Sequence, residues 1–186
     1  RIDATASGDV SLAGLSAVAR GIASLGAATT VDFTAERRLD EPRTTVHAEI
    51  ASESLRDSGE VVVAFFPRGE GDAPLPFDPG RLAGRGRASA VMVLDGETPP
   101  DVTIEFSVLD PAYAMVAADA ASGTLATEGE AFVLRGAQAR KGDGAFALDD
   151  GKVSRRRGGG WRFAGRLDRW PAADLLRDLG VPGSPS

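Results

Sequence analysis

The sequence predicts a mainly β fold. We expect an antiparallel β-meander that forms a curled open sheet or a sandwich, with one or two short helices. Apolar and polar residues alternate over several short segments, as they do where one face of a strand is buried. Glycine, proline and aspartate separate these segments, as turn residues do. Helical spacing is scarce in a chain of 186 residues with 23 glycines and 11 prolines.

From the N-terminus, the first expected helix covers residues 11–26, where aliphatic side chains approach helical spacing in spite of two interior glycines. Strands are expected at residues 31–35, 45–50 and 102–108, because apolar residues occupy every second position there. The stretch GEVVVAFFPRG is apolar at consecutive positions, and its run 61–66 is typical of a strand covered on both faces.

Residues 69–86 are crowded with glycine and proline and are expected to form a long irregular loop. This loop is too weak a boundary to divide the chain, so we expect residues 1–186 to be a single β-rich domain. The turn sequences LDEP (39–42) and LDPA (109–112) separate neighbouring strands.

From residue 124 onward, short strands alternate regularly with turns, as in a meander. Turns are expected at 128–129, 142–144, 149–151 and 158–160. A second short helix is expected at 171–179, since Pro171 suits a first helical turn and Gly180 suits a stop.

The composition excludes several functional classes. A net charge of −6 and the lack of a basic stripe argue against nucleic acid as a partner. The absence of cysteine excludes disulfides and thiolate metal sites. No apolar run approaches the roughly 20 residues of a membrane-spanning helix. Because the first residue is Arg1, we expect a piece of a longer or processed protein, with any targeting segment or anchor outside it.

The residues offer little for catalysis. His47 is the single histidine and lies on the polar face of an alternating strand, where a solvated side chain is the simplest interpretation. Asp143, Asp149 and Asp150 occur in the glycine-containing sequences KGDG and LDDG and are typical turn residues, too few for a calcium cage. The arginines at 155–157 are a candidate phosphate or lipid-headgroup contact, or a solvated hairpin tip. We therefore expect no enzyme activity, no cofactor and no metal.

The C-terminal third carries a more specific pattern. LDDG at 148–151 is followed by WRFAGRL at 161–167 and by a tryptophan–proline pair and Leu175. These short motifs, over about residues 120–180, resemble the AsmA-like superfamily of bacterial envelope proteins, and most of all its YhdP-type branch and a related domain of unknown function. The remainder of the chain adds only compatible strand alternation.

The resemblance implies a segment of a periplasmic protein whose parent is anchored in the inner membrane. It implies an apolar β-groove for phospholipid transport and envelope integrity. Its partners would be phospholipid acyl chains and other envelope proteins, and membrane contact would be made by parts outside this chain. The candidate groove-lining residues are Val102, Ile104, Phe106, Phe132, Leu134, Phe146, Trp161 and Phe163.

Two alternatives stay open at this stage. The apolar faces that carry these eight residues are also what an ordinary buried core would require. A ligand-free β-sandwich that serves as an interaction module of an exported protein would show the same alternation.

Overall fold

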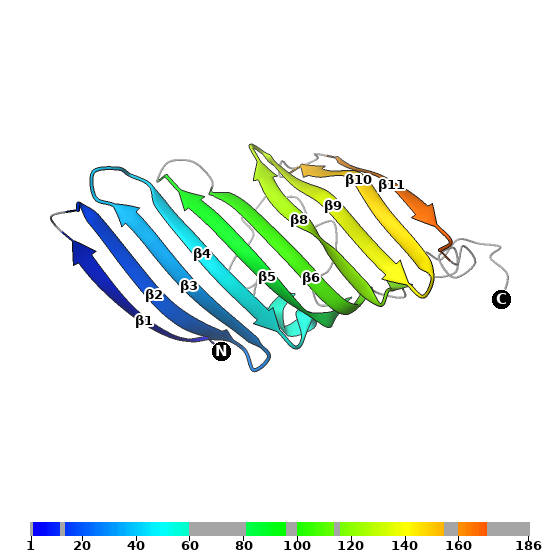
Figure 1. Cartoon of the computed structure of the whole chain (residues 1–186), viewed down its shortest axis with the longest axis horizontal. Helices are drawn as coiled ribbons and strands as arrows, with labels where there is room; N and C mark the ends of the chain where they lie inside the picture. Colours follow the sequence, from blue (N-terminus) through cyan, green and yellow to red (C-terminus); the bar gives the residue numbers. More distant parts are fainter. Residues whose placement is uncertain are drawn as a thin grey trace.

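A computed structural model describes residues 2–11, 14–59, 81–95, 100–113, 116–154 and 160–170. These residues form one antiparallel sheet of eleven strands (Figure 1). The predicted meander is confirmed in its curled, open form, because the described residues contain a single sheet. The strands are β1 (Ile2–Ser11), β2 (Ser16–Leu25), β3 (Thr29–Arg38), β4 (Thr44–Ser52), β5 (Leu82–Leu94), β6 (Asp101–Tyr113), β7 (Val116–Ala117), β8 (Ala120–Glu128), β9 (Ala131–Lys141), β10 (Gly144–Ser154) and β11 (Trp161–Asp168).

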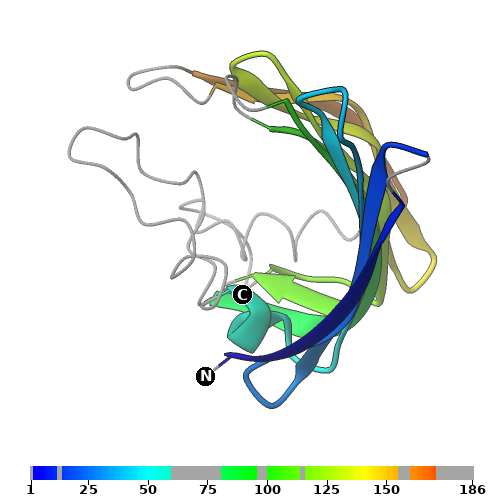
Figure 2. The ribbon, with the colours of Figure 1, turned by 90° about the vertical axis from the view of Figure 1, so that its left-hand side faces the viewer.

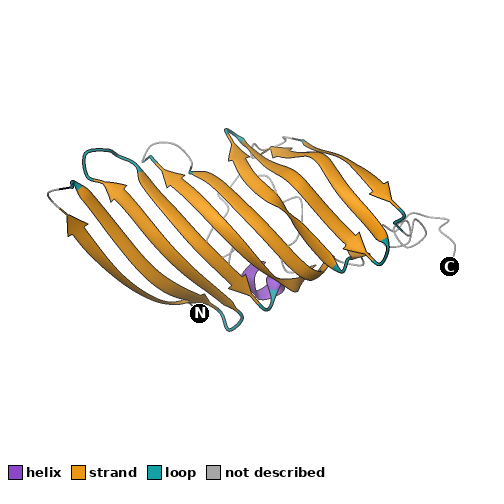
Figure 3. Cartoon of the chain, in the orientation of Figure 1, coloured by secondary structure: helices purple, strands orange, loops and turns teal. Residues whose placement is uncertain are grey.

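Strands that are consecutive in the chain lie beside one another in the sheet, in the order β1-β2-β3-β4-β5-β6-β8-β9-β10-β11, and the short β7 pairs with β6. The long strands bend along their length, so the sheet is a trough whose axis runs across the strands (Figures 1 and 2). A short helix at residues 55–59 accompanies the sheet (Figure 3). Within the described residues, no helix has the length and apolar character that crossing a membrane requires.

The two faces of the sheet differ in chemistry, as the pairing register shows. Residues paired directly across antiparallel strands project to the same face. One such row crosses the sheet from β1 to β11 and contains only apolar residues and glycine. Its members are Ala6, Gly21, Phe33, Ala48, Ala90, Ile104, Leu125, Leu134, Gly151 and Phe163.

The adjacent row projects to the opposite face and is mostly polar or charged. Its members are Ser7, Arg20, Thr34, His47, Val91, Thr103, Ala126, Val133, Lys152 and Arg162. The sheet is therefore apolar on one face and mainly polar on the other.

The apolar face is the concave one. Thr29 of β3 and Ser52 of β4 lie on the same face as Phe33, because their positions differ from the apolar row by even numbers of residues. Both hydroxyls bond to Ser58 in the short helix, at 2.6 Å each. That helix lies inside the curve of the sheet (Figure 2). We call this surface the concave apolar face.

Phenylalanine rings cover glycines on the concave apolar face. A Cβ built on Gly21 would lie 2.7 Å from Cζ of Phe33, the residue directly across on β3. The pair of Gly123 and Phe106 repeats the arrangement at 3.1 Å. The missing glycine side chain lets the ring lie against the backbone of the next strand, so the aromatic groups flatten onto the sheet.

The same arrangement recurs twice at the C-terminal end of the sheet. A Cβ on Gly151 would lie 2.9 Å from Cδ1 of Phe163, its partner on β11. A Cβ on Gly165 would lie 2.8 Å from Cε2 of Phe146 on β10. The floor of the trough is thus shaped by four aromatic–glycine contacts.

Full burial is confined to a small part of the described chain. The buried apolar residues all belong to β8, β9 and β10 and are small or aliphatic. The buried apolar residues are Ala126, Ala131, Val133, Ala137 and Leu148. Ala126, Ala131 and Val133 project to the face opposite the concave apolar face, and Ala137 and Leu148 project to the concave apolar face itself.

The helix expected at residues 11–26 is wrong. The described part of this segment is the end of β1, a turn at 14–15 and β2. The helical spacing of its aliphatic residues is outweighed by pairing of β2 with both β1 and β3. Gly21, which weakens a helix, is required in β2 because of the Phe33 ring.

Three loop and turn predictions also need correction. The predicted loop 69–86 ends too late, because residues 82–86 already belong to β5. The predicted turn at 109–112 lies within β6, where Asp110 adopts a positive φ of 52° opposite an irregularity in β5. The predicted turn at 149–151 is a bulge inside β10, between Leu148 and Asp150. In all three places the ladder continues through residues that commonly end strands.

The remaining expectations divide in two. Strands at 31–35, 45–50 and 102–108 are confirmed, as are the turns after residues 38, 128 and 141. Five other predictions concern residues outside the described part of the chain. They are the strand at 61–66, the first twelve residues of the predicted loop, the arginines at 155–157, the turn residues 158–159 and the helix at 171–179.

We predict that Gly21→Ala destabilises the fold. The added Cβ would meet the Thr5 carbonyl oxygen at 2.5 Å as well as the Phe33 ring, so both β1 and the ring would have to shift. Overpacking of this kind lowers the free energy of unfolding by about 1–3 kcal/mol. Urea denaturation followed by circular dichroism measures the change.

Gly160→Ala is the matched control, because a Cβ on Gly160 meets nothing within 4 Å. Equal stability of the two variants would show that the Gly21–Phe33 contact imposes no constraint.

Candidate functional site: the concave apolar face

All eight predicted lining residues belong to the same face. Val102, Ile104 and Phe106 alternate along β6, and the register connects Ile104 with Leu134 of β9 through Leu125. Phe163 joins the same row through Gly151. Phe132 of β9 and Phe146 of β10 lie an even number of paired positions from this row and so share its face. The backbone of Trp161 in β11 has the same register, two residues before Phe163.

The concave apolar face extends beyond these eight residues into strands that the sequence analysis left out. On β1 and β2 it consists mainly of alanine and glycine. On β6 to β11 most of its large side chains are phenylalanine, leucine and valine. The missed signal was the alternation in β2, which helical spacing obscured. The additional small residues on β1 and β2 are Ala4, Ala6, Gly8, Ala17, Ala19, Gly21 and Ala23.

Small residues suit an arched strand. Side chains on the inside of a curve converge, so alanine and glycine leave room that larger groups would fill. The large side chains of the concave apolar face therefore lie mainly on the C-terminal strands, and the N-terminal strands β1 and β2 carry mainly small ones.

The concave apolar face stays accessible at both edges of the sheet. Val10 on β1 is 67% exposed, and Phe163 and Leu167 on β11 are 45% and 53% exposed. Among the described residues, no strand pairs with the outer edge of β1 or β11. The face is thus open along the trough axis.

The short helix is fixed to one margin of this face by hydroxyl groups. Thr29 Oγ1 donates to Ser52 Oγ at 3.0 Å, and both oxygens lie 2.6 Å from Ser58 Oγ. Thr29 and Ser52 are buried. Ser54 caps the helix, because its hydroxyl accepts from the Asp57 amide. The serine followed three residues later by an acidic residue was a signal for this helix that the sequence analysis missed.

The candidates for catalytic chemistry lie away from the concave apolar face. His47 is exposed on the convex face between Thr34 and Val91. The bulge in β10 turns Asp149 and Asp150 toward β11, where Arg166 and Arg162 donate to them at 2.9 and 2.8 Å. Both carboxylates are therefore neutralised by arginines.

Asp143 is remote from that pair. It lies in the turn before β10, six residues and about 20 Å of strand from Asp149. The three aspartates do not converge, and the described residues contain no cluster of three or more metal-ligating side chains.

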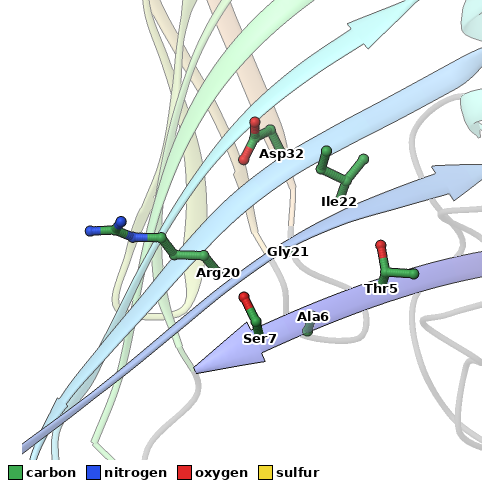
Figure 4. A pocket seen from close by; sticks show the side chains of 7 residues that line it. All are labelled: Thr5, Ala6, Ser7, Arg20, Gly21, Ile22 and Asp32. Carbon is green, nitrogen blue, oxygen red and sulfur yellow. The ribbon is translucent and has the colours of Figure 1, made fainter. Parts of the chain in front are cut away.

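Two shallow hollows lie mainly on the convex side. One, of about 420 Å³, is lined by residues of β1, β2 and β3, including Arg20, Ile22 and Asp32 (Figure 4). The other, of about 480 Å³, lies near the ends of β8 to β11 beside Glu128, Lys152 and Arg162. Both are open to solvent and neither gathers side chains around a common point.

An exposed ion cluster marks the end of β3. Arg38 Nε donates to Asp40 Oδ1 at 3.1 Å, Arg38 Nη2 donates to Asp40 Oδ2 at 2.9 Å, and Glu41 lies 3.3 Å from Nε. The hydrogen bond from Arg38 holds the pKa of Asp40 below its usual value. Arg38 projects to the convex face, since it pairs with Ser16 next to the concave Ala17.

Comparisons with protein-family models, with curated proteins and with solved structures found no match.

Thr29→Val should lower the free energy of unfolding by about 1–2 kcal/mol, because it removes a buried hydroxyl that bonds to two partners. Faster hydrogen exchange at the Ser58 amide would show that the helix has loosened.

The matched control is Thr30→Val on the convex face, which should stay within about 0.5 kcal/mol of wild type. Equal effects at positions 29 and 30 would exclude the hydroxyl cluster as the anchor of the helix.

The pKa of Asp40 should lie below the usual value of an aspartate, and Arg38→Gln should raise it. A lowered folded-state pKa means that the contribution to stability is present above the unfolded-state pKa and is lost as pH falls through the folded value. Carboxyl-carbon NMR across the acidic range measures both. An unchanged Asp40 pKa in the variant would exclude Arg38 as the cause.

Proposed function

We propose that this chain is a non-enzymatic segment of an apolar groove that carries phospholipid acyl chains in the bacterial cell envelope. The parent protein is periplasmic and anchored in the inner membrane through parts outside this chain. The single observation that carries the proposal is the uninterrupted apolar row across the concave face, from Ala6 to Phe163, with no second layer of described residues over it.

The energetics favour an apolar occupant. Contiguous exposed apolar surface beyond a few hundred Å² is rare on soluble proteins and marks interaction sites. Each methylene group moved from water onto such a surface contributes about 0.8 kcal/mol. An acyl chain that lies along the trough axis would contact several strands at once. Each of its methylene groups in contact with the face would add this amount to the free energy of binding.

The aromatic–glycine contacts support the same function. Four phenylalanine rings lie within about 3 Å of the place where a glycine Cβ would stand, so they pack close to the backbone of the neighbouring strand. A floor with rings packed close to the backbone offers a flexible chain more continuous contact than a floor with projecting rings. Such a floor lets a flexible chain shift along the trough without losing contact area. Transport needs this property and needs no catalytic group.

The rival function is a ligand-free interaction module, in which protein surface covers the concave apolar face. It differs from the lipid proposal in one observable: the molecule that is released when the purified chain is denatured. The sandwich form of this rival has no support in the described residues, which form one sheet.

Native mass spectrometry of the recombinant chain tests the proposal. We expect phospholipid to co-purify with wild type. Phe106→Asp should reduce the lipid-bound fraction by about tenfold or more, because a carboxylate in the apolar floor would be desolvated by the acyl chain.

Ser107→Asp is the control, since it adds the same charge to the exposed, convex side of the same strand. It should retain wild-type lipid. Phe106→Asp that folds and carries the same amount of lipid as Ser107→Asp would rule out the concave apolar face as the binding surface.

A further inference from the structure

Charged residues are almost excluded from the concave apolar face. Among residues paired in the described ladders, the register places only Arg37 and Lys141 on it with charged side chains. Lys141 is the last residue of β9 and Arg37 is the last but one of β3, so both lie at a margin of the trough. Both are cations, although the chain has 27 acidic and 21 basic residues. The margins of the groove therefore differ in charge from the protein as a whole.

Arg37 is the more available of the two. It is exposed, and it makes no hydrogen bond or ion pair with another described residue, whereas Lys141 already has an interaction. Its neighbour Arg38 is held by Asp40 on the other face. Adjacent arginines on one strand thus have opposite roles: Arg38 is neutralised, and Arg37 presents its charge beside apolar surface.

The lateral neighbours of Arg37 on the concave apolar face carry no charge. A lateral row of the register places it between Ala17 and Thr44, with Val10 and Leu94 one strand further on each side. Those two aliphatic side chains are 67% and 37% exposed. At a strand spacing of about 4.8 Å, each lies about 10 Å from Arg37. One cation is therefore flanked by exposed aliphatic groups at the margin of an apolar trough.

We infer that Arg37 is a headgroup-selecting residue: it binds the phosphate of an anionic phospholipid whose acyl chains lie on the concave apolar face. The inference rests on the proposed function and adds the headgroup class and the residue that reads it. A guanidinium forms paired hydrogen bonds with phosphate, and such charge-assisted bonds gain strength beside apolar surface, where water is less able to screen them.

Fluorescence titration with two lipids tests the inference. The probes are phosphatidylglycerol and diacylglycerol that carry the same labelled acyl chain, so they differ only in the presence of the anionic headgroup. Wild type should bind phosphatidylglycerol more tightly. Arg37→Gln should weaken that binding roughly 3- to 10-fold, as expected for an exposed charge-assisted contact, and change diacylglycerol binding less than about twofold.

Arg38→Gln is the matched control, because it removes the same charge one residue away on the convex face. It should leave both affinities unchanged. Equal weakening by the two variants would overturn the inference and assign the effect to net charge. Equal loss of both lipids in Arg37→Gln would overturn it too, since a headgroup contact cannot affect diacylglycerol.

The outcomes separate this inference from the proposed function. Wild type that binds neither lipid contradicts the groove itself. Wild type that binds both lipids equally, with no effect of Arg37→Gln, leaves the groove intact and contradicts headgroup selection. Inorganic phosphate at millimolar concentration should not displace phosphatidylglycerol, and displacement would indicate a simple anion site in place of a lipid site.

Discussion

The structure depends on one constraint: side chains on the inner face of a curved sheet have less room than side chains on its outer face. Curvature brings the concave side chains together, and this limits their size on β1 and β2, where alanine and glycine predominate. On the C-terminal strands, bulk is admitted where a glycine on the next strand makes room for it, as with Gly123 beneath Phe106. Shape and composition of the trough therefore have a common cause.

Sequence patterns predict the order of strands in this fold better than they predict its bulges and turns. Period-two alternation was sufficient to predict the meander and to place the eight candidate residues on one face. It failed where two patterns overlapped, as in β2, whose leucine and isoleucine spacing also fits a helix. It failed again where aspartate and glycine, common in turns, occur in a bulge such as that at Asp149. Pairing with the neighbouring strand determines whether such a segment is a helix, a turn or part of a strand. Local sequence does not show which strand will be the neighbour.

The site was predictable in outline only. Its apolar character follows from the alternation of residues along each strand. The aromatic–glycine contacts and the position of Arg37 depend instead on which residues of two neighbouring strands lie side by side. In a pair such as Gly21 and Phe33, these residues are 12 positions apart in the sequence. The convex aspartates illustrate the converse. In sequence, Asp149 and Asp150 were candidates for an ion cage, whereas the bulge directs them to two arginines of β11.

The aromatic–glycine contacts also have an evolutionary consequence. A glycine such as Gly21 cannot gain a side chain while Phe33 stays in place, because a Cβ there would lie within 2.9 Å of two ring atoms. Replacement of Phe33 alone does not free position 21, because the Thr5 carbonyl oxygen would still lie 2.5 Å from the added Cβ. A glycine is therefore retained at position 21 more strictly than the aromatic residue at position 33. Distant relatives of this chain would preserve this glycine longer than its aromatic partner. Glycines such as Gly21 are thus a better guide to kinship than overall similarity.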